Sequence, residues 1–329
     1  MDWSTIKSIA LPEGVAKQLA IAGVVVWDSG SEPPPIDYSK TWVKYTDNSE
    51  VYLDITGTLA TNSIPNLATV KELRIGTNVT SLGSTALTAA WRTMTNISVP
   101  NTITAIPNNF CKAGDSIGRG PTALSSAILP DTIVTIGSES FRAGSLPSFT
   151  FPANTRSVGN YCFSYSHQLK DVHINAALTS LGSQVFGDTT ALSSITIDEN
   201  NPSFKVESGM LLNKSGTELW KIPPAMTHGN IVVPEGVTKL KFDACNTLTC
   251  ESLVLPSTLT TIEQAVFNSS SFTTPPSIPS SVTSIAAQYW DIPIVFADRT
   301  MAQVQSMRGY PWNWSAGAQY ICTDGTITR

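Results

Sequence analysis

The sequence predicts a mainly β protein: a right-handed solenoid of short parallel strands with a separate module at each end. Its main evidence is a recurring phrase in which an apolar residue and proline are followed, six positions after the proline, by Ile, Val or Leu. Two further copies have Gly76 or Asn175 in place of the proline. The copies begin at positions 76, 100, 130, 152, 175, 234, 256 and 279, so most steps lie between 22 and 30 and one is 59. A period in the low twenties is typical of coils that bury their apolar faces against neighbouring coils.

Each coil has the same expected parts. An apolar alternation such as Leu124 to Leu129 predicts a short strand with one buried face, and the proline after it ends the strand by removing a backbone donor. A glycine often follows the six-residue step, and an aromatic ring comes four residues later, as in Gly137 and Phe141. We expect the glycine to supply a tight corner and the ring to fill the interior of the coil.

Over residues 70–290, this pattern resembles the BspA-like leucine-rich repeats of bacterial surface proteins. The 59-residue step supports the resemblance, because Asn201-Pro202-Ser203-Phe204 followed by Gly209 to Leu212 is similar to the hairpin insertion of that family, here at about 198–230. The resemblance implies a leucine-rich-repeat solenoid and a non-enzymatic role in adhesion or recognition. The first two coils depart from the pattern, with Leu87 and Phe110-Cys111 where later coils have Ala or Ser before Phe.

The two ends do not follow the repeat. Residues 1–32 read as a β module, residues 33–69 as a proline-rich spacer and an N-terminal hairpin cap, and residues 291–329 as a C-terminal cap module. The opening from Ile6 to Trp27 resembles N-terminal pieces of phage virion proteins, and the ending from Tyr310 to Ile327 resembles a closing module on repeat proteins of gut bacteria and their phages. Tryptophans in these ends are either cap cores or a docking interface; the docking candidates are Trp3, Trp27, Trp312 and Trp314.

The composition of the chain argues against nucleic acid and membranes as its partners. The chain has 329 residues, of which 41% are hydrophobic and 14% charged, with a net charge of −5, and no basic stripe that would favour nucleic acid. No apolar run approaches the ~20 residues of a membrane span, so we expect no membrane insertion. Asp2 precedes Lys7, which is unlike a secretory signal. We therefore expect that an export signal is missing from this chain or that the protein is not exported by that route.

The search for catalytic chemistry favours a protein that is not an enzyme and has no cofactor. Gly114 to Gly118 matches G-x-S-x-G but lacks the strand and helix that a nucleophile elbow requires. The three histidines, His167, His173 and His228, have no spacing suited to zinc, and Asp198 to Asn201 lacks the alternating ligands of a calcium loop. Five scattered cysteines fit buried apolar positions better than disulfides or metal ligands.

The candidate binding surface is a ladder of outward residues, one from each successive strand. In a solenoid these line one continuous face, which is the natural recognition surface, although a solvated sheet face with no ligand is the alternative. The loop 112–122 in the longest coil is a second candidate. The ladder consists of Arg74, Ser98, Ile128, Thr150, His173, Thr196, Val232, Val254 and Ser277.

The favoured hypothesis is a non-enzymatic recognition protein, a phage virion or tail-associated component that binds a host-surface protein or glycan, with the N-terminal module contacting other virion proteins. The first alternative is a bacterial cell-surface adhesin, and the second is a structural decoration or spacer. The favoured hypothesis places the protein on the virion, and the alternative location is extracellular, on the bacterial cell surface. The spacer hypothesis predicts that substitutions along the ladder from Arg74 to Ser277 change only solubility.

Overall fold

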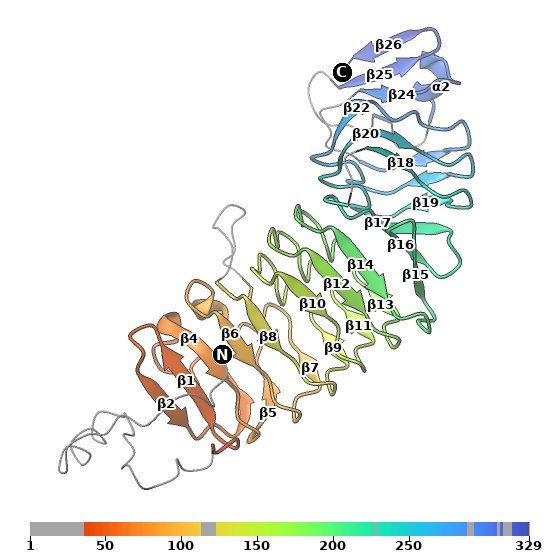
Figure 1. Ribbon diagram of the computed structural model, residues 1–329. Helices are drawn as coiled ribbons and strands as arrows, with labels where there is room; N and C mark the ends of the chain where they lie inside the picture. The colour runs from red at the N-terminus through yellow and green to blue at the C-terminus, as the bar shows by residue number, and fades with distance from the viewer. Residues whose placement is uncertain are drawn as a thin grey trace, which may run out of the picture.

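The computed structural model in Figure 1 describes residues 36–112, 123–226, 229–287, 293–307, 310–311 and 318–328. The expectations for residues 1–32, Trp3, Trp27, Trp312, Trp314, His228 and the Gly114 to Gly118 motif therefore lie outside the described residues, as does all of the 112–122 loop except Lys112.

The chain winds into an elongated solenoid whose strands form two ribbons, and this confirms the predicted β solenoid. Within each sheet of a ribbon, successive strands pair in parallel, with the later coil stacked on the earlier one. The first ribbon comprises β4 (Val70–Arg74), β6 (Asn96–Ser98), β8 (Ser126–Ile128), β10 (Ser148–Thr150), β12 (Asp171–Ile174), β14 (Ser194–Ile197), β18 (Asn230–Val232), β20 (Thr249–Val254) and β22 (Ser271–Thr274).

The second ribbon is made by the short strands that follow each six-residue step. It comprises β3 (Gly57–Leu59), β5 (Val79–Leu82), β7 (Ala105–Ile106), β9 (Thr135–Ile136), β11 (Ser157–Val158), β13 (Ser180–Leu181), β19 (Lys239–Leu240), β21 (Thr261–Ile262) and β23 (Ser284–Ile285).

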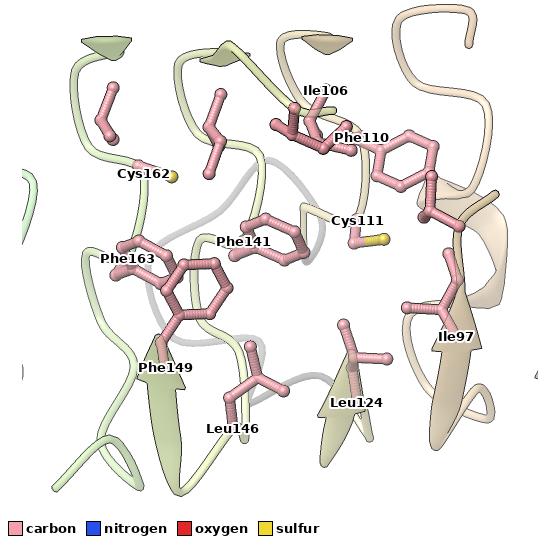
Figure 2. Packing of buried hydrophobic residues seen from close by; sticks show 14 of the residues in the cluster. Ile97, Ile106, Phe110, Cys111, Leu124, Phe141, Leu146, Phe149, Cys162 and Phe163 are labelled. Atoms are coloured by element: carbon pink, nitrogen blue, oxygen red, sulfur yellow. The ribbon is translucent and has the colours of Figure 1, made fainter. Parts of the chain in front are cut away.

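The interior between the ribbons is apolar, and the repeated aromatic residue fills it as the sequence predicts. Phe141 and Phe163 are stacked with ring centroids 5.6 Å apart, and Phe163 stacks on Phe186 of the next coil at 6.1 Å. Figure 2 shows the rings of Phe141 and Phe163 pointing inward, in the same core as Leu124, Leu146 and Phe149. Cys111 and Cys162 lie in the same core, as buried free thiols.

The recurring glycine has a different role from the expected one. Gly137, Gly159 and Gly182 do not adopt a left-handed conformation; a Cβ on them would lie 2.4–2.5 Å from a backbone nitrogen of the preceding coil. Close stacking of coils, and not a tight corner, is therefore what requires glycine there. The left-handed φ falls two residues later, on Glu139 (57°), Tyr161 (57°) and Gln184 (52°). This conformation costs a residue with a side chain roughly 1 kcal/mol.

Hydroxyl groups tie each coil to the one before it. The Thr or Ser two positions after the proline donates to a carbonyl of the preceding coil: Thr102 to Val79 at 2.6 Å and Thr132 to Ile103 at 2.6 Å. The same bond runs from Thr258 to Val237 at 2.8 Å and from Ser281 to Leu259 at 2.6 Å. These bonds account for the hydroxyl in the repeated phrase, because it satisfies a carbonyl at the turn.

An antiparallel hairpin covers the first coil. Strands β1 (Thr41–Tyr45) and β2 (Glu50–Leu53) pair with each other, and β1 also pairs antiparallel with β4. The exposed strand edge of the solenoid is therefore paired. Short 3₁₀ segments η3 (Leu67–Thr69) and η4 (Thr88–Ala90) complete the first coils.

The insertion and the C-terminal end have local structures of their own. Strands β15 (Phe204–Glu207), β16 (Met210–Asn213) and β17 (Glu218–Lys221) form an antiparallel meander that rejoins the repeat where β17 pairs in parallel with β19. The C-terminal end contains β24 (Ile294–Val295), helix α2 (Met301–Gln305), and a hairpin of β25 (Gln319–Cys322) and β26 (Gly325–Thr328).

Candidate functional site

The outward ladder residues lie in register on the first ribbon, but the ribbon is interrupted twice. Arg74 pairs with Ser98 and Ser98 with Ile128; separately, Thr150 pairs with His173 and His173 with Thr196. Val232 pairs with Val254 in a third sheet. The expected continuous face is thus three adjoining sheets, divided between β8 and β10 and between β14 and β18. Ser277 lies outside the strands of the third sheet and forms an isolated parallel bridge to Val295 of the C-terminal end.

The N-terminal part of the ladder carries an aromatic and cationic cluster. The Arg74 guanidinium lies 4.7 Å from the ring centroid of Tyr38 and 6.0 Å from that of Tyr52, and it donates to the Asp37 carbonyl at 3.4 Å. Trp42, which is opposite both Tyr52 and Arg74 in the sheet, donates from its indole to Glu50 at 3.0 Å. Tyr38 is 60% exposed and Tyr52 49%, so this end presents rings that a ligand can contact.

The middle of the ladder is polar, and some of its side chains form hydrogen bonds with one another. The His173 ring nitrogen Nδ1 lies 2.9 Å from the Thr196 hydroxyl of the next coil. His167 makes a similar contact with Thr190, at 3.2 Å, on another part of the coil. His173 therefore occupies the outward strand position that the sequence predicts. Its contact with Thr196 joins two successive coils.

Apolar side chains stand outward at three ladder positions. Ile128 is 64% exposed, Val232 59% and Val254 50%. In each of these strands, the residues on either side of the exposed one point into the core. The exposed side chain could therefore be buried only if the strand changed its register. These three residues are the most exposed aliphatic side chains of the ladder.

Sequence reasoning missed a buried polar cluster where the insertion rejoins the solenoid. A cavity of about 310 Å³ separates the sheet that ends at β13 from the one that contains β17 and β19. Its lining includes Gln184, Trp220, Lys221, Lys241 and Asp243. Lys221 lies in the insertion and Asp243 in the copy of the repeat that follows it, so no local motif predicts the pair.

Burial governs the charges of this cluster. Lys221 is 3% exposed and donates to the carbonyls of Asp243 at 3.3 Å and Asn246 at 3.4 Å. Desolvation lowers the pKa of Lys221 to about 8 and raises that of Asp243 to about 7, opposed in both cases by the attraction between the two groups. Gln184 donates to one carboxylate oxygen of Asp243. Since both groups are covered, the cluster joins coils and does not present an acid and a base to a ligand.

The remaining candidates for chemistry are placed as follows. Cys111, Cys162, Cys245 and Cys250 are buried free thiols, and burial raises the pKa of Cys245 to about 12. Within the described part of the chain, no group of His, Cys, Asp and Glu side chains could hold a metal ion. Asp198 instead forms a turn, in which its carboxylate accepts the Asn200 N–H at 2.9 Å. No helix among the described residues is long and apolar enough to cross a membrane.

Comparisons with known proteins agree with this architecture. Residues 119–219 and 225–291 match the BspA type leucine-rich repeat region in six copies. A leucine-rich repeat protein from Eubacterium ventriosum aligns with a TM-score of 0.66 and 21% identity, over 79% of this chain and 77% of its own. A leucine-rich repeat protein from Bacteroides ovatus aligns with a TM-score of 0.45 and 17% identity, over 78% of this chain and 56% of its own.

A leucine-rich cell surface protein from Faecalibacterium prausnitzii aligns with a TM-score of 0.37 and 18% identity, over 82% of this chain and 90% of its own. No curated protein sequence matches the chain. The Eubacterium structure shows the same fold as this chain, and the repeat match covers half of its residues. By its repeats and by its fold, the chain belongs to the BspA-type leucine-rich repeat family.

Proposed function

We propose that this chain is a non-enzymatic recognition protein that binds a surface receptor through the outward ladder of its first ribbon. The observation that carries the proposal is the exposure of Ile128, Val232 and Val254 at ladder positions. Outward strand positions on a solvated sheet face are usually polar, and exposed apolar side chains on a rigid scaffold favour contact with a partner that covers them. The exposed rings of Tyr38 and Tyr52 extend the same face.

The finer proposal is that the protein is a phage virion or tail-associated component and that its receptor is a host-surface protein or glycan. It is supported by the resemblance of the two ends to phage and gut bacterial modules. Residues 1–32 would contact other virion proteins, with Trp3 and Trp27 as the docking residues and Trp312 and Trp314 at the other end. The alternative, a bacterial cell-surface adhesin, is supported by the surface proteins that the repeat pattern resembles.

Location separates these two hypotheses. Purified virus particles and the washed cell-surface fraction of the source culture are analysed by quantitative mass spectrometry. We expect the protein in particles at a fixed copy number relative to a capsid protein. Detection on cells alone would reject the virion proposal and support the adhesin.

Receptor binding is tested on the ladder itself. The double variant Val232→Thr/Val254→Thr keeps β-branched side chains and removes apolar contact area, so we expect a folded protein with weaker binding to host cells. Val134→Thr is the matched control, because Val134 is 37% exposed but lies outside the ladder. Equal binding by the wild type, the double variant and Val134→Thr would instead favour the spacer hypothesis.

A further inference from the structure

The first ribbon has an opening between β8 and β10 that the repeat pattern does not predict. The two strands come from successive coils and lie next to each other in Figure 1, yet they belong to different sheets. No backbone hydrogen bond among the described residues joins them. On the second ribbon the same two coils stay paired, with Thr135 opposite Ser157 and Ile136 opposite Val158. The coils are therefore closed on one side and open on the other.

Pro147 accounts for the start of the opening. In the neighbouring coils, the residue just before the strand donates its N–H to the preceding coil: Thr95 to Lys71 at 2.7 Å, Ser125 to Thr95 at 2.9 Å, Lys170 to Pro147 at 2.8 Å and Ser193 to Lys170 at 2.9 Å. Pro147 occupies this position before β10 and has no N–H. The Ser125 carbonyl therefore receives no such bond, and the first rung of the ladder is missing.

A cleft of about 430 Å³ occupies this opening, with β8 and β10 as its walls. By the register of the adjoining coils, Ala127 and Leu129 direct backbone groups into it from β8, and Ser148 and Thr150 do so from β10. Backbone donors and acceptors thus face each other across the cleft without a ladder between them. This is the hydrogen-bonding pattern that an added strand satisfies on both sides.

Side chains around the cleft define what the added strand would carry. The inward position on β8 is Ala127, which is partly exposed, whereas the equivalent Ile97 and Phe149 are 2% and 6% exposed. The small side chain leaves space for an apolar residue of the incoming strand. Asp131 is the one charged residue among the described lining residues, and its carboxylate accepts the Ala153 N–H at 2.9 Å. Its negative charge favours a Lys or Arg at that end of the strand.

We propose that this cleft binds an extended peptide segment of a partner protein as an additional strand, with an apolar residue directed inward beside Ala127 and a cationic residue near Asp131. The inference rests on the proposed recognition function and names the class of partner at one place on the solenoid. Strand addition gives affinity through backbone hydrogen bonds and selectivity through alternate side chains.

The test uses the full chain and a displayed library of random short peptides as the probe. We expect the selected peptides to alternate apolar and polar residues, to contain Lys or Arg, and to slow hydrogen exchange at the amides of Ala127, Leu129, Ser148 and Thr150. N-methylation of alternate backbone nitrogens in a selected peptide should weaken binding about tenfold or more, because strand hydrogen bonds are lost.

Two variants check the assignment on the protein side. Pro147→Thr restores the donor found at Thr95, and Ala127→Ile fills the inward space as Ile97 does in the preceding coil. Both should fold and should bind the selected peptides about tenfold more weakly. The matched control Ser193→Thr changes the equivalent position in a closed part of the ribbon and should leave binding unchanged.

Three outcomes would overturn the assignment: a selection that returns no peptide, peptides that bind Pro147→Thr as tightly as the wild type, or a dimer in sedimentation that Pro147→Thr abolishes. The last would place a second copy of this chain in the cleft. The proposed function is judged separately. If Val232→Thr/Val254→Thr loses host-cell binding while Pro147→Thr retains it, ladder recognition stands and the peptide cleft does not.

Discussion

The backbone N–H of Asp188 donates to the side-chain oxygen of Asn246 at 2.8 Å across a separation of 58 residues. The bond passes over the whole hairpin insertion and joins the last coil before it to the first complete coil after it. Asn246 also donates to the Asn268 carbonyl of the following coil at 3.2 Å. One buried amide side chain therefore links three stacked coils.

Replacement of Asn246 by Ala should destabilise the protein by about 1–3 kcal/mol, because it removes the acceptor of the part-buried Asp188 N–H. Urea unfolding monitored by circular dichroism measures the change. The control is Asn200→Ala, since Asn200 is exposed in a turn and should alter stability little. Equal effects of the two substitutions would contradict the role of Asn246 as a link.

The buried carboxyl of Asp243 predicts a pH dependence of stability. Its pKa is raised by burial from 3.8 to about 7, so between these values the unfolded chain has released a proton that the folded chain retains. Stability should therefore decrease as pH rises from about 4 to about 7, by on the order of 2–4 kcal/mol from this group alone.

Asp243→Asn should remove that decrease, because the amide does not titrate. Lys221 acts in a higher window: its pKa is lowered from 10.5 to about 8, so its contribution makes stability rise with pH between these values. Urea midpoints measured from pH 4 to pH 10 test both statements. A pH profile of Asp243→Asn that matches the wild type would contradict the first, and Asp171→Asn, at an exposed strand position, provides the control.

The stacked rings predict a large effect of Phe163. This residue is 1% exposed and its ring contacts those of Phe141, Phe149 and Phe186. Phe163→Ala should destabilise the protein by about 3–5 kcal/mol, since it removes the ring and leaves a cavity. Phe163→Leu keeps most of the apolar volume and should cost clearly less. Thermal unfolding of both variants measures the difference, and equal losses would argue against a packing role.

The close approach of coils predicts that Gly159 does not tolerate a methyl group. A Cβ there would lie 2.4 Å from the Ser138 backbone nitrogen, so the two coils would have to separate. Gly159→Ala should cost about 3 kcal/mol. The reverse change Ala286→Gly, at the equivalent position of a later coil, should cost less than about 1 kcal/mol. A Gly159→Ala variant as stable as the wild type would contradict the close approach of the two coils as the reason for this glycine.

Several features of the fold were accessible from the sequence because they repeat. The inward Phe141, Phe163 and Phe186 were predicted from one spacing, since every coil presents the same position to the same interior. The role of Asn175 was not predictable in this way. It replaces a proline, is 6% exposed, and its side chain donates to the Thr155 carbonyl at 3.1 Å and accepts the Leu178 N–H at 2.7 Å. Its partners are set by two coils at once.

The solenoid, its period, its core and the outward ladder positions follow from the amino-acid pattern alone, because burial between neighbouring coils requires the same residue types at every turn. The folded arrangement of the coils was needed to locate the breaks in the ladder, to show which coils meet across the insertion, and to explain why glycine is needed at Gly137 and Gly159. Those properties depend on how two coils approach each other in space. The missing donor of Pro147 opens the ribbon only because Ser125 lies opposite it, and the Lys221 and Asp243 cluster forms only because β17 of the insertion pairs in parallel with β19.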